Sequence, residues 1–70
     1  MRHFNFFVLQ HEQGKLRTWS VCRCPIGVSW LDVPPQHYTT AGKWDKREER
    51  AQHFGSYDLA YKTLDKVVTS

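Results

Sequence analysis

The sequence predicts one small α+β domain, in which an antiparallel β-sheet of three or four strands carries a C-terminal α-helix on one face. Three observations predict it: two β-rich runs flank a turn near the N-terminus, a helical stripe ends the chain, and ten of 70 residues are aromatic. A chain of this length buries only about 60% of its unfolded surface, which excludes a second domain. Aromatic side chains, each burying about 150–250 Å², therefore have to supply much of the core.

The first expected element is a β-hairpin over residues 3–24. Two runs rich in aromatic and β-branched residues flank a turn segment that contains Gly14. The hydrophobic pattern favours the register in which paired residue numbers sum to 27, because one face then becomes continuously apolar. The members of that face are Phe4, Phe6, Val8, Trp19 and Val21. A three-residue loop with Gly14 in a left-handed bulge is the alternative, and it would shift the register by one.

The opposite face of the hairpin is half polar, as is typical of the open side of an antiparallel sheet. Its exposed apolar members are expected to be Phe7, Leu9 and Leu16. Because an edge strand and an uncovered half-apolar face can pair with a second copy of the chain, a homodimer is one expected form.

The middle of the chain, residues 25–48, is expected to form an edge segment and loop. Residues 28–33 have the composition of a short third strand or extended edge, stopped by Pro34-Pro35, since proline supplies no N–H to a ladder. Residues 36–43 are expected to be loop, broken at Gly42. Asp45 could cap a helical turn over residues 45–50, but we favour a last strand over residues 49–54.

The final element is a helix over residues 57–68. Ser56 is a good N-cap, and Asp58 stands in the first turn, where the helix dipole favours an anion. Six apolar residues follow helical spacing: Tyr57, Ala60, Tyr61, Leu64, Val67 and Val68. A helix this short is marginal alone, so it should dock on the apolar face of the hairpin, with both tyrosines in the interface.

Charge and hydropathy limit the class of protein. The net charge of +3 is spread along the chain, whereas dedicated nucleic-acid binders cluster their basic residues. The short apolar run Phe6–Leu9 does not make a signal peptide, and no run approaches the roughly 20 apolar residues of a membrane span. Two cysteines are too few for a disulfide framework. We expect a cytoplasmic protein with reduced thiols, no membrane association and no cofactor.

The cysteines and histidines form the first candidate for chemistry. In the favoured register His3 lies opposite Cys24 and beside Cys22, which would gather three zinc ligands or a thiol with a base. His11, His37 and His53 are further candidates. However, Cys-x-Cys lacks the usual zinc spacing, and no pocket or oxyanion site accompanies the thiols. We therefore expect half-buried cysteines beside a terminal histidine, no metal and no enzyme activity.

The second candidate is a binding surface. Three large aromatics fall in the edge segment and loop, outside the core expected above, with basic residues nearby. We expect this set to form a protein-binding patch: Trp30, Tyr38, Trp44, Lys46, Arg47 and Arg50. An alternative is a site for single-stranded nucleic acid, in which Trp19 stacks on bases between Arg17 and Arg23.

These observations favour a non-enzymatic protein-binding module. In size and composition the chain resembles the compact accessory proteins of bacteriophages and mobile elements, among them inhibitors of host defence. That resemblance implies a protein that blocks a surface of a larger assembly without catalysis, and it assigns no residue. A small nucleic-acid-binding module is the alternative, and a cysteine–histidine zinc or thiol site is the less favoured one.

Overall fold

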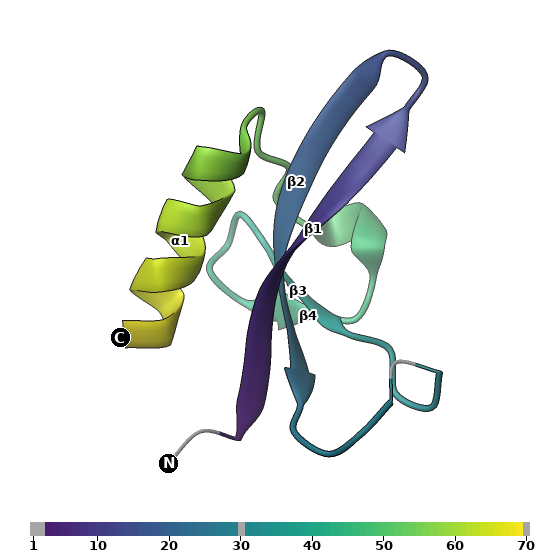
Figure 1. Ribbon diagram of the computed structural model, residues 1–70, viewed down its shortest axis with the longest axis vertical. Coiled ribbons are helices and arrows are strands. Elements are labelled where there is room, and N and C mark those ends of the chain that lie inside the picture. The colour runs from purple at the N-terminus through teal and green to yellow at the C-terminus, as the bar shows by residue number, and fades with distance from the viewer. Residues whose placement is uncertain (1–2, 30, 70) are drawn as a thin grey trace.

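A computed structural model of the chain describes residues 3–29 and 31–69 and confirms the α+β fold (Figure 1). The four strands form one antiparallel sheet in the order β1-β2-β3-β4. The elements in chain order are β1 (Phe4–Gln13), β2 (Leu16–Pro25), β3 (Gln36–Tyr38), β4 (Trp44–Asp45), the 3-10 helix η1 (Glu48–Arg50) and α1 (Tyr57–Thr69). The long hairpin of β1 and β2 dominates the molecule, which measures 37 × 27 × 19 Å.

The hairpin was predicted correctly, but the favoured register is wrong by two residues. Phe4 pairs with Pro25 and Gln13 with Leu16, so paired numbers sum to 29. The cause is a two-residue turn at Gly14-Lys15. Gly14 has φ +63° and Lys15 does not have a positive φ, which is the pattern of a type II′ turn that matches the strand twist. Because the shift is two residues, every side chain keeps its predicted face.

The third strand lies later in the chain than predicted. Residues 28–29 are irregular and residues 31–33 form a turn and bend instead of a strand, because the Ser29 carbonyl accepts hydrogen bonds from the amides of Asp32 (3.0 Å) and Val33 (2.9 Å). β3 begins only at Gln36, after the two prolines, within the segment expected to be loop. A tight turn that includes Gly42 at φ +75° then leads into β4.

The strand favoured over residues 49–54 is also a correction. Glu48–Arg50 form η1, and in the segment that follows, Ala51 and Phe54 each make an isolated bridge among the described residues, to Thr39 and Trp19. Before η1, the Asp45 carboxylate accepts a hydrogen bond from the Arg47 amide at 2.9 Å. The alternative interpretation, a helical turn over residues 45–50 capped by Asp45, is therefore correct only in part: η1 begins at Glu48, and its N-cap residue, Arg47, makes no side-chain cap hydrogen bond.

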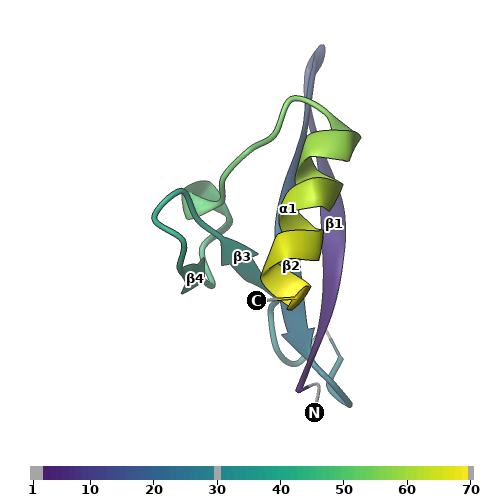
Figure 2. The ribbon, with the colours of Figure 1, turned by 90° about the vertical axis from the view of Figure 1, so that its left-hand side faces the viewer.

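The helix begins and ends within one residue of its predicted bounds. The Leu59 amide donates to the Ser56 hydroxyl at 3.3 Å, which confirms the N-cap. Figure 2 shows α1 lying along the hairpin, against which it packs. Ala60 is fully buried. The two tyrosines do not lie in the core as expected: Tyr57 is 52% exposed and Tyr61 54%.

The small side chain of Ala60 explains the position of the tyrosines. The least exposed line of the helix runs through buried Ala60 and half-buried Leu64 and Val67, which recur at the spacing of one helix face. Tyr57 and Tyr61 lie on one flank of that line. Because alanine lets the helix approach the strands closely, only this narrow line meets the sheet, and the tyrosines remain on the flank.

The two helices occupy opposite sides of the hairpin (Figure 1). Glu48 of η1 contacts His11, which lies on the β1 face opposite to that of Phe6. The helix α1 therefore covers the apolar face that was predicted for it. The expectation that the other face is open is wrong over much of its area, since Ser20, Cys22 and Cys24 are all buried.

Candidate functional site

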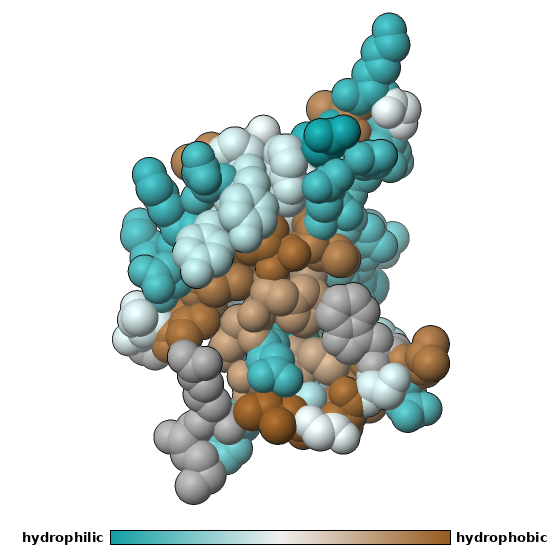
Figure 3. Space-filling view, in the orientation of Figure 1, coloured by the Kyte–Doolittle hydropathy of each residue, from teal (hydrophilic) through white to brown (hydrophobic). Residues whose placement is uncertain are grey.

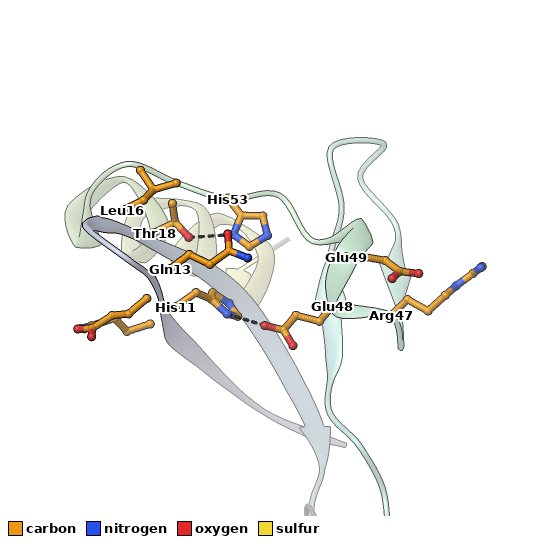
Figure 4. Close-up of a pocket in the computed structure, with 10 residues that line it drawn as sticks. His11, Gln13, Leu16, Thr18, Arg47, Glu48, Glu49 and His53 are labelled. Carbon is orange, nitrogen blue, oxygen red and sulfur yellow. Dashed lines mark hydrogen bonds and ion pairs between the residues drawn. The ribbon is translucent and has the colours of Figure 1, made fainter.

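An open pocket of about 840 Å³ lies between the hairpin tip and η1 (Figure 4). Among its titratable side chains are His11 from β1, Glu48 from η1 and His53 from the segment before α1. The rings of His11 and His53 meet edge to face at 5.1 Å, and His53 Nδ1 lies 2.9 Å from the Thr18 hydroxyl. The pocket gathers residues that are distant in the sequence.

A hydrogen-bonded chain of side chains runs from this pocket into the sheet. His11 Nδ1 donates to the Glu48 carboxylate at 2.7 Å, and His11 Nε2 lies 2.7 Å from Ser20 Oγ. Ser20 Oγ is 3.6 Å from Cys22 Sγ, which is 3.2 Å from His37 Nδ1. With His11 neutral, one proton order satisfies all four contacts: Ser20 donates to His11, Cys22 donates to Ser20, and His37 donates to Cys22.

Burial changes the acidity of the inner members of this chain. Desolvation raises the pKa of the Cys22 thiol and lowers the pKa of the His37 imidazole, because each charged form would lose its hydration. Both groups are therefore neutral near pH 7. The chain of hydrogen bonds connects four elements: η1 through Glu48, β1 through His11, β2 through Ser20 and Cys22, and β3 through His37.

The order of Glu48, His11 and Ser20 is that of an acid, a base and a hydroxyl in hydrolases. Ser20 is fully buried, however, and its hydroxyl is already held between His11 and Cys22. A substrate carbonyl has no approach to this oxygen in the folded chain. The arrangement therefore fits a buried hydrogen-bond network that connects elements of the fold better than it fits a nucleophilic serine.

The cysteines do not meet the histidine expected beside them. Cys24 pairs with Asn5 and not with His3, because the register differs from the favoured one. Both thiols are free and buried. Within residues 3–29 and 31–69, no three His, Cys, Asp or Glu side chains are placed to hold a metal ion.

Two of the aromatics expected in a binding patch pack together and onto the hairpin. The Tyr38 and Trp44 rings meet at 5.3 Å, and Trp44 lies 5.9 Å from Phe6. The Arg23 guanidinium is placed between the rings of Phe4 (4.1 Å) and Trp44 (4.4 Å), a double cation–π contact. Tyr38 and Trp44 are half-buried, so the prediction that they lie outside the core is wrong in part.

Two of the basic members of that predicted patch lie around Asp45, which follows Trp44 in β4. Lys46, Arg47 and Arg50 are exposed, and the last two lie 3.4 and 3.8 Å from the Asp45 carboxylate. The hydrogen bond from the Arg47 amide, with these cations, lowers the pKa of Asp45. Trp30 lies outside the described residues. A binding role for this set stays a prediction.

The residues of the predicted nucleic-acid site have partners within the fold. Arg17 lies 3.3 Å from Glu12, Arg23 is held between two rings, and half-buried Trp19 exchanges two backbone hydrogen bonds with Phe54. All three residues are on the face that α1 covers. The fold does not present them as one exposed stacking surface.

Sequence reasoning missed an exposed tyrosine pair on α1. The rings of Tyr57 and Tyr61 stack at 5.9 Å with an interplanar angle of 27°. A shallow hollow of about 460 Å³ lies against them, flanked by Asp58 and Lys62. The signal was present in the sequence, since a helical line centred on Ala60 leaves both tyrosines on one flank.

Comparisons with protein families, with curated proteins and with solved structures find no match to this chain. The helices among the described residues are too short or too polar to cross a membrane. The geometry of the chain itself is therefore the basis for proposing a function.

Proposed function

We propose that this chain is a non-enzymatic protein-binding module of the cytoplasm, which inhibits or modulates a larger assembly by covering part of its surface. The observation that carries the proposal is the exposed tyrosine pair of α1, Tyr57 with Tyr61. Tyrosine is enriched at the energetic centres of protein interfaces, because it offers a large rigid contact surface and a polar tip. Two such rings side by side, each about half exposed, form a contiguous aromatic patch, and patches of this kind are typical of interaction sites.

The surroundings of the pair also suit a protein partner. Asp58 and Lys62 border the rings with one negative and one positive charge, as in the polar rim around an interface centre. The helix is docked on the hairpin through Ala60, which is fully buried on its inner side. A partner would thus meet two aligned rings with little loss of conformational entropy.

The test uses the intact chain as bait in its native host. Tyr57→Ala with Tyr61→Ala should release the captured partner, whereas Leu59→Ala should retain it. Leu59 is a matched control, because it is 53% exposed on the same helix but on the other flank. Captured proteins are quantified by mass spectrometry, and the fold of each variant is checked by circular dichroism.

The proposal fails if no protein is lost with the tyrosine variant and retained with the leucine variant. Loss of nucleic acid from the captured material, with no change in protein, would also overturn it. A variant that replaces Lys46, Arg47 and Arg50 by Ala tests the basic residues in the same experiment. If this variant alone releases the captured partner, the binding site lies in the segment after β4 and not on α1.

A further inference from the structure

The outer edge of β1 takes no part in the hydrogen-bonded chain that begins at Glu48 or in the tyrosine pair of α1. β1 is the first strand of the sheet and has ten residues, whereas the strand at the other edge, β4, has two. Within residues 3–29 and 31–69, no strand pairs with the outer side of β1. Its register with β2 is continuous and contains no bulge.

The hydrogen bonds of the hairpin show which residues face this edge. The Ile26 amide donates to the His3 carbonyl, and on the far side of β2, Trp19 exchanges backbone bonds with Phe54. Since bonded pairs alternate in an antiparallel ladder, the odd residues of β1 bond to β2. The N–H and C=O groups of Phe4, Phe6, Val8 and Gln10 therefore point outward.

Natural proteins protect an edge strand with lysine, proline, a bulge or a covering segment. The run Phe4–Gln10 has no charged residue and no proline. A hollow of about 480 Å³ runs along residues 5–9 and is also lined by Cys24, Pro25 and Val28, so it lies over the paired ends of β1 and β2 beside this edge. Figure 3 shows apolar side chains gathered at the centre of the side on which β1 lies in front.

We infer that this edge pairs with the β1 edge of a second copy, across a two-fold axis at Phe7. In that register Phe4 lies opposite Gln10 of the other copy and Phe6 opposite Val8, so the whole uncharged run pairs with itself. All outward groups of the run are then bonded, in about eight hydrogen bonds. The inference concerns a different surface from the tyrosine pair and does not depend on it.

Charge favours this register over its neighbours. Along Phe4–Gln10 no charge of one copy faces a charge of the other, so the destabilising like-charge pairs are avoided. A register shifted toward the hairpin tip would set the Glu12 carboxylate against Phe4. The two copies each carry a net charge of +3, and the repulsion between them makes added salt strengthen the dimer.

The size of the contact indicates a weak dimer. Seven paired residues span about 24 Å, and with side chains on both faces they bury on the order of 500 Å² per copy. A stable interface buries roughly 800 Å² per partner, so association belongs in the micromolar range or weaker. Because the other edge of the sheet is only two residues long, the assembly closes at two copies.

The test measures sedimentation of the full chain from micromolar to millimolar concentration, together with amide hydrogen exchange. We expect a monomer–dimer equilibrium, in which the amides of Phe6 and Val8 exchange more slowly as concentration rises. The amide of Leu9, already bonded to β2, should change far less. Asn5→Lys should weaken the dimer about tenfold or more, by setting a charge beside Leu9 of the second copy.

Thr40→Lys is the matched control, because it adds the same charge to an exposed turn and should leave the dimer intact. Should Asn5→Lys unfold the chain, backbone N-methylation of Phe6 in a synthetic chain removes one outward donor and keeps every side chain. A monomer at all concentrations would overturn the inference. So would species larger than a dimer, or a dimer that both edge variants leave unchanged.

Discussion

The contact between Cys22 and His37 shows how burial sets the behaviour of single residues. The two side chains are 0% and 5% exposed, and each is hydrogen-bonded within the sheet. Desolvation raises the pKa of the thiol and lowers that of the imidazole, so both shifts favour the neutral pair. Neither shift could be predicted from the sequence, because the strand that carries His37 was expected to be loop.

This pair predicts a stability maximum near neutral pH. Below the ordinary His pKa of 6.5, the unfolded chain binds a proton on His37 that the folded chain resists, so the free energy of unfolding falls as pH falls. Above the ordinary Cys pKa of 9.0, the unfolded thiol ionises and the folded one resists, so stability falls as pH rises. Urea unfolding at about pH 5.5, 7.5 and 10 measures both limbs.

Two variants separate the limbs of that profile. His37→Gln should reduce the fall in the free energy of unfolding on the acid side, at pH values above the range in which Asp45 titrates. Cys22→Ser should reduce the fall in the free energy of unfolding on the alkaline side. Both should cost stability at neutral pH, since each breaks a buried hydrogen bond. Unchanged slopes in both variants would show that other groups control the pH dependence.

Among the elements, the hairpin shows which sequence signals were decisive. The alternation of side chains correctly assigned Phe6 and Trp19 to the face that α1 covers. It could not set the register, because a shift of two residues preserves both faces. The turn decided it: Gly14 accepts a positive φ, and a two-residue loop then requires Gln13 to pair with Leu16. In the short elements after Pro35, long-range contacts outweighed the local pattern.

The hairpin predicts the effect of substitution at Gly14. A Cβ at this position would meet no atom within 4 Å, so any cost comes from the backbone alone. Gly14→Ala should destabilise the fold by about 1–2 kcal/mol, because an L-residue resists φ +63°. Replacement by D-alanine should be neutral or stabilising by about 0.5 kcal/mol, since that residue favours positive φ. Equal effects of the two enantiomers in thermal unfolding would contradict the type II′ turn.

At the scale of the whole molecule, the aromatic residues within residues 3–29 and 31–69 include rings that close the core and rings that lie outside it. The fully buried residues are small: Ser20, Val21, Cys22 and Ala60 are each 0% exposed. The half-buried ring of Trp44 covers one end of the core through its contacts with Phe6 and Tyr38. Tyr57 and Tyr61 lie outside the core. Sequence composition predicted that aromatics supply the core. It could not assign individual rings, because the position of a ring depends on how closely α1 and β4 approach the hairpin.

This division predicts opposite outcomes for two aromatic substitutions. Trp44→Ala should cost about 2–3 kcal/mol, less than for a fully buried ring, because it removes the contacts with Phe6, Tyr38 and Arg23. In a domain of this size that lowers Tm by about 10–20 °C. Tyr61→Ala removes a half-exposed ring stacked on Tyr57 and should shift Tm by less than about 5 °C. Thermal unfolding followed by circular dichroism measures both. Similar shifts for the two variants would mean that the tyrosine pair is part of the core, and the binding surface assigned to α1 would then have to be abandoned.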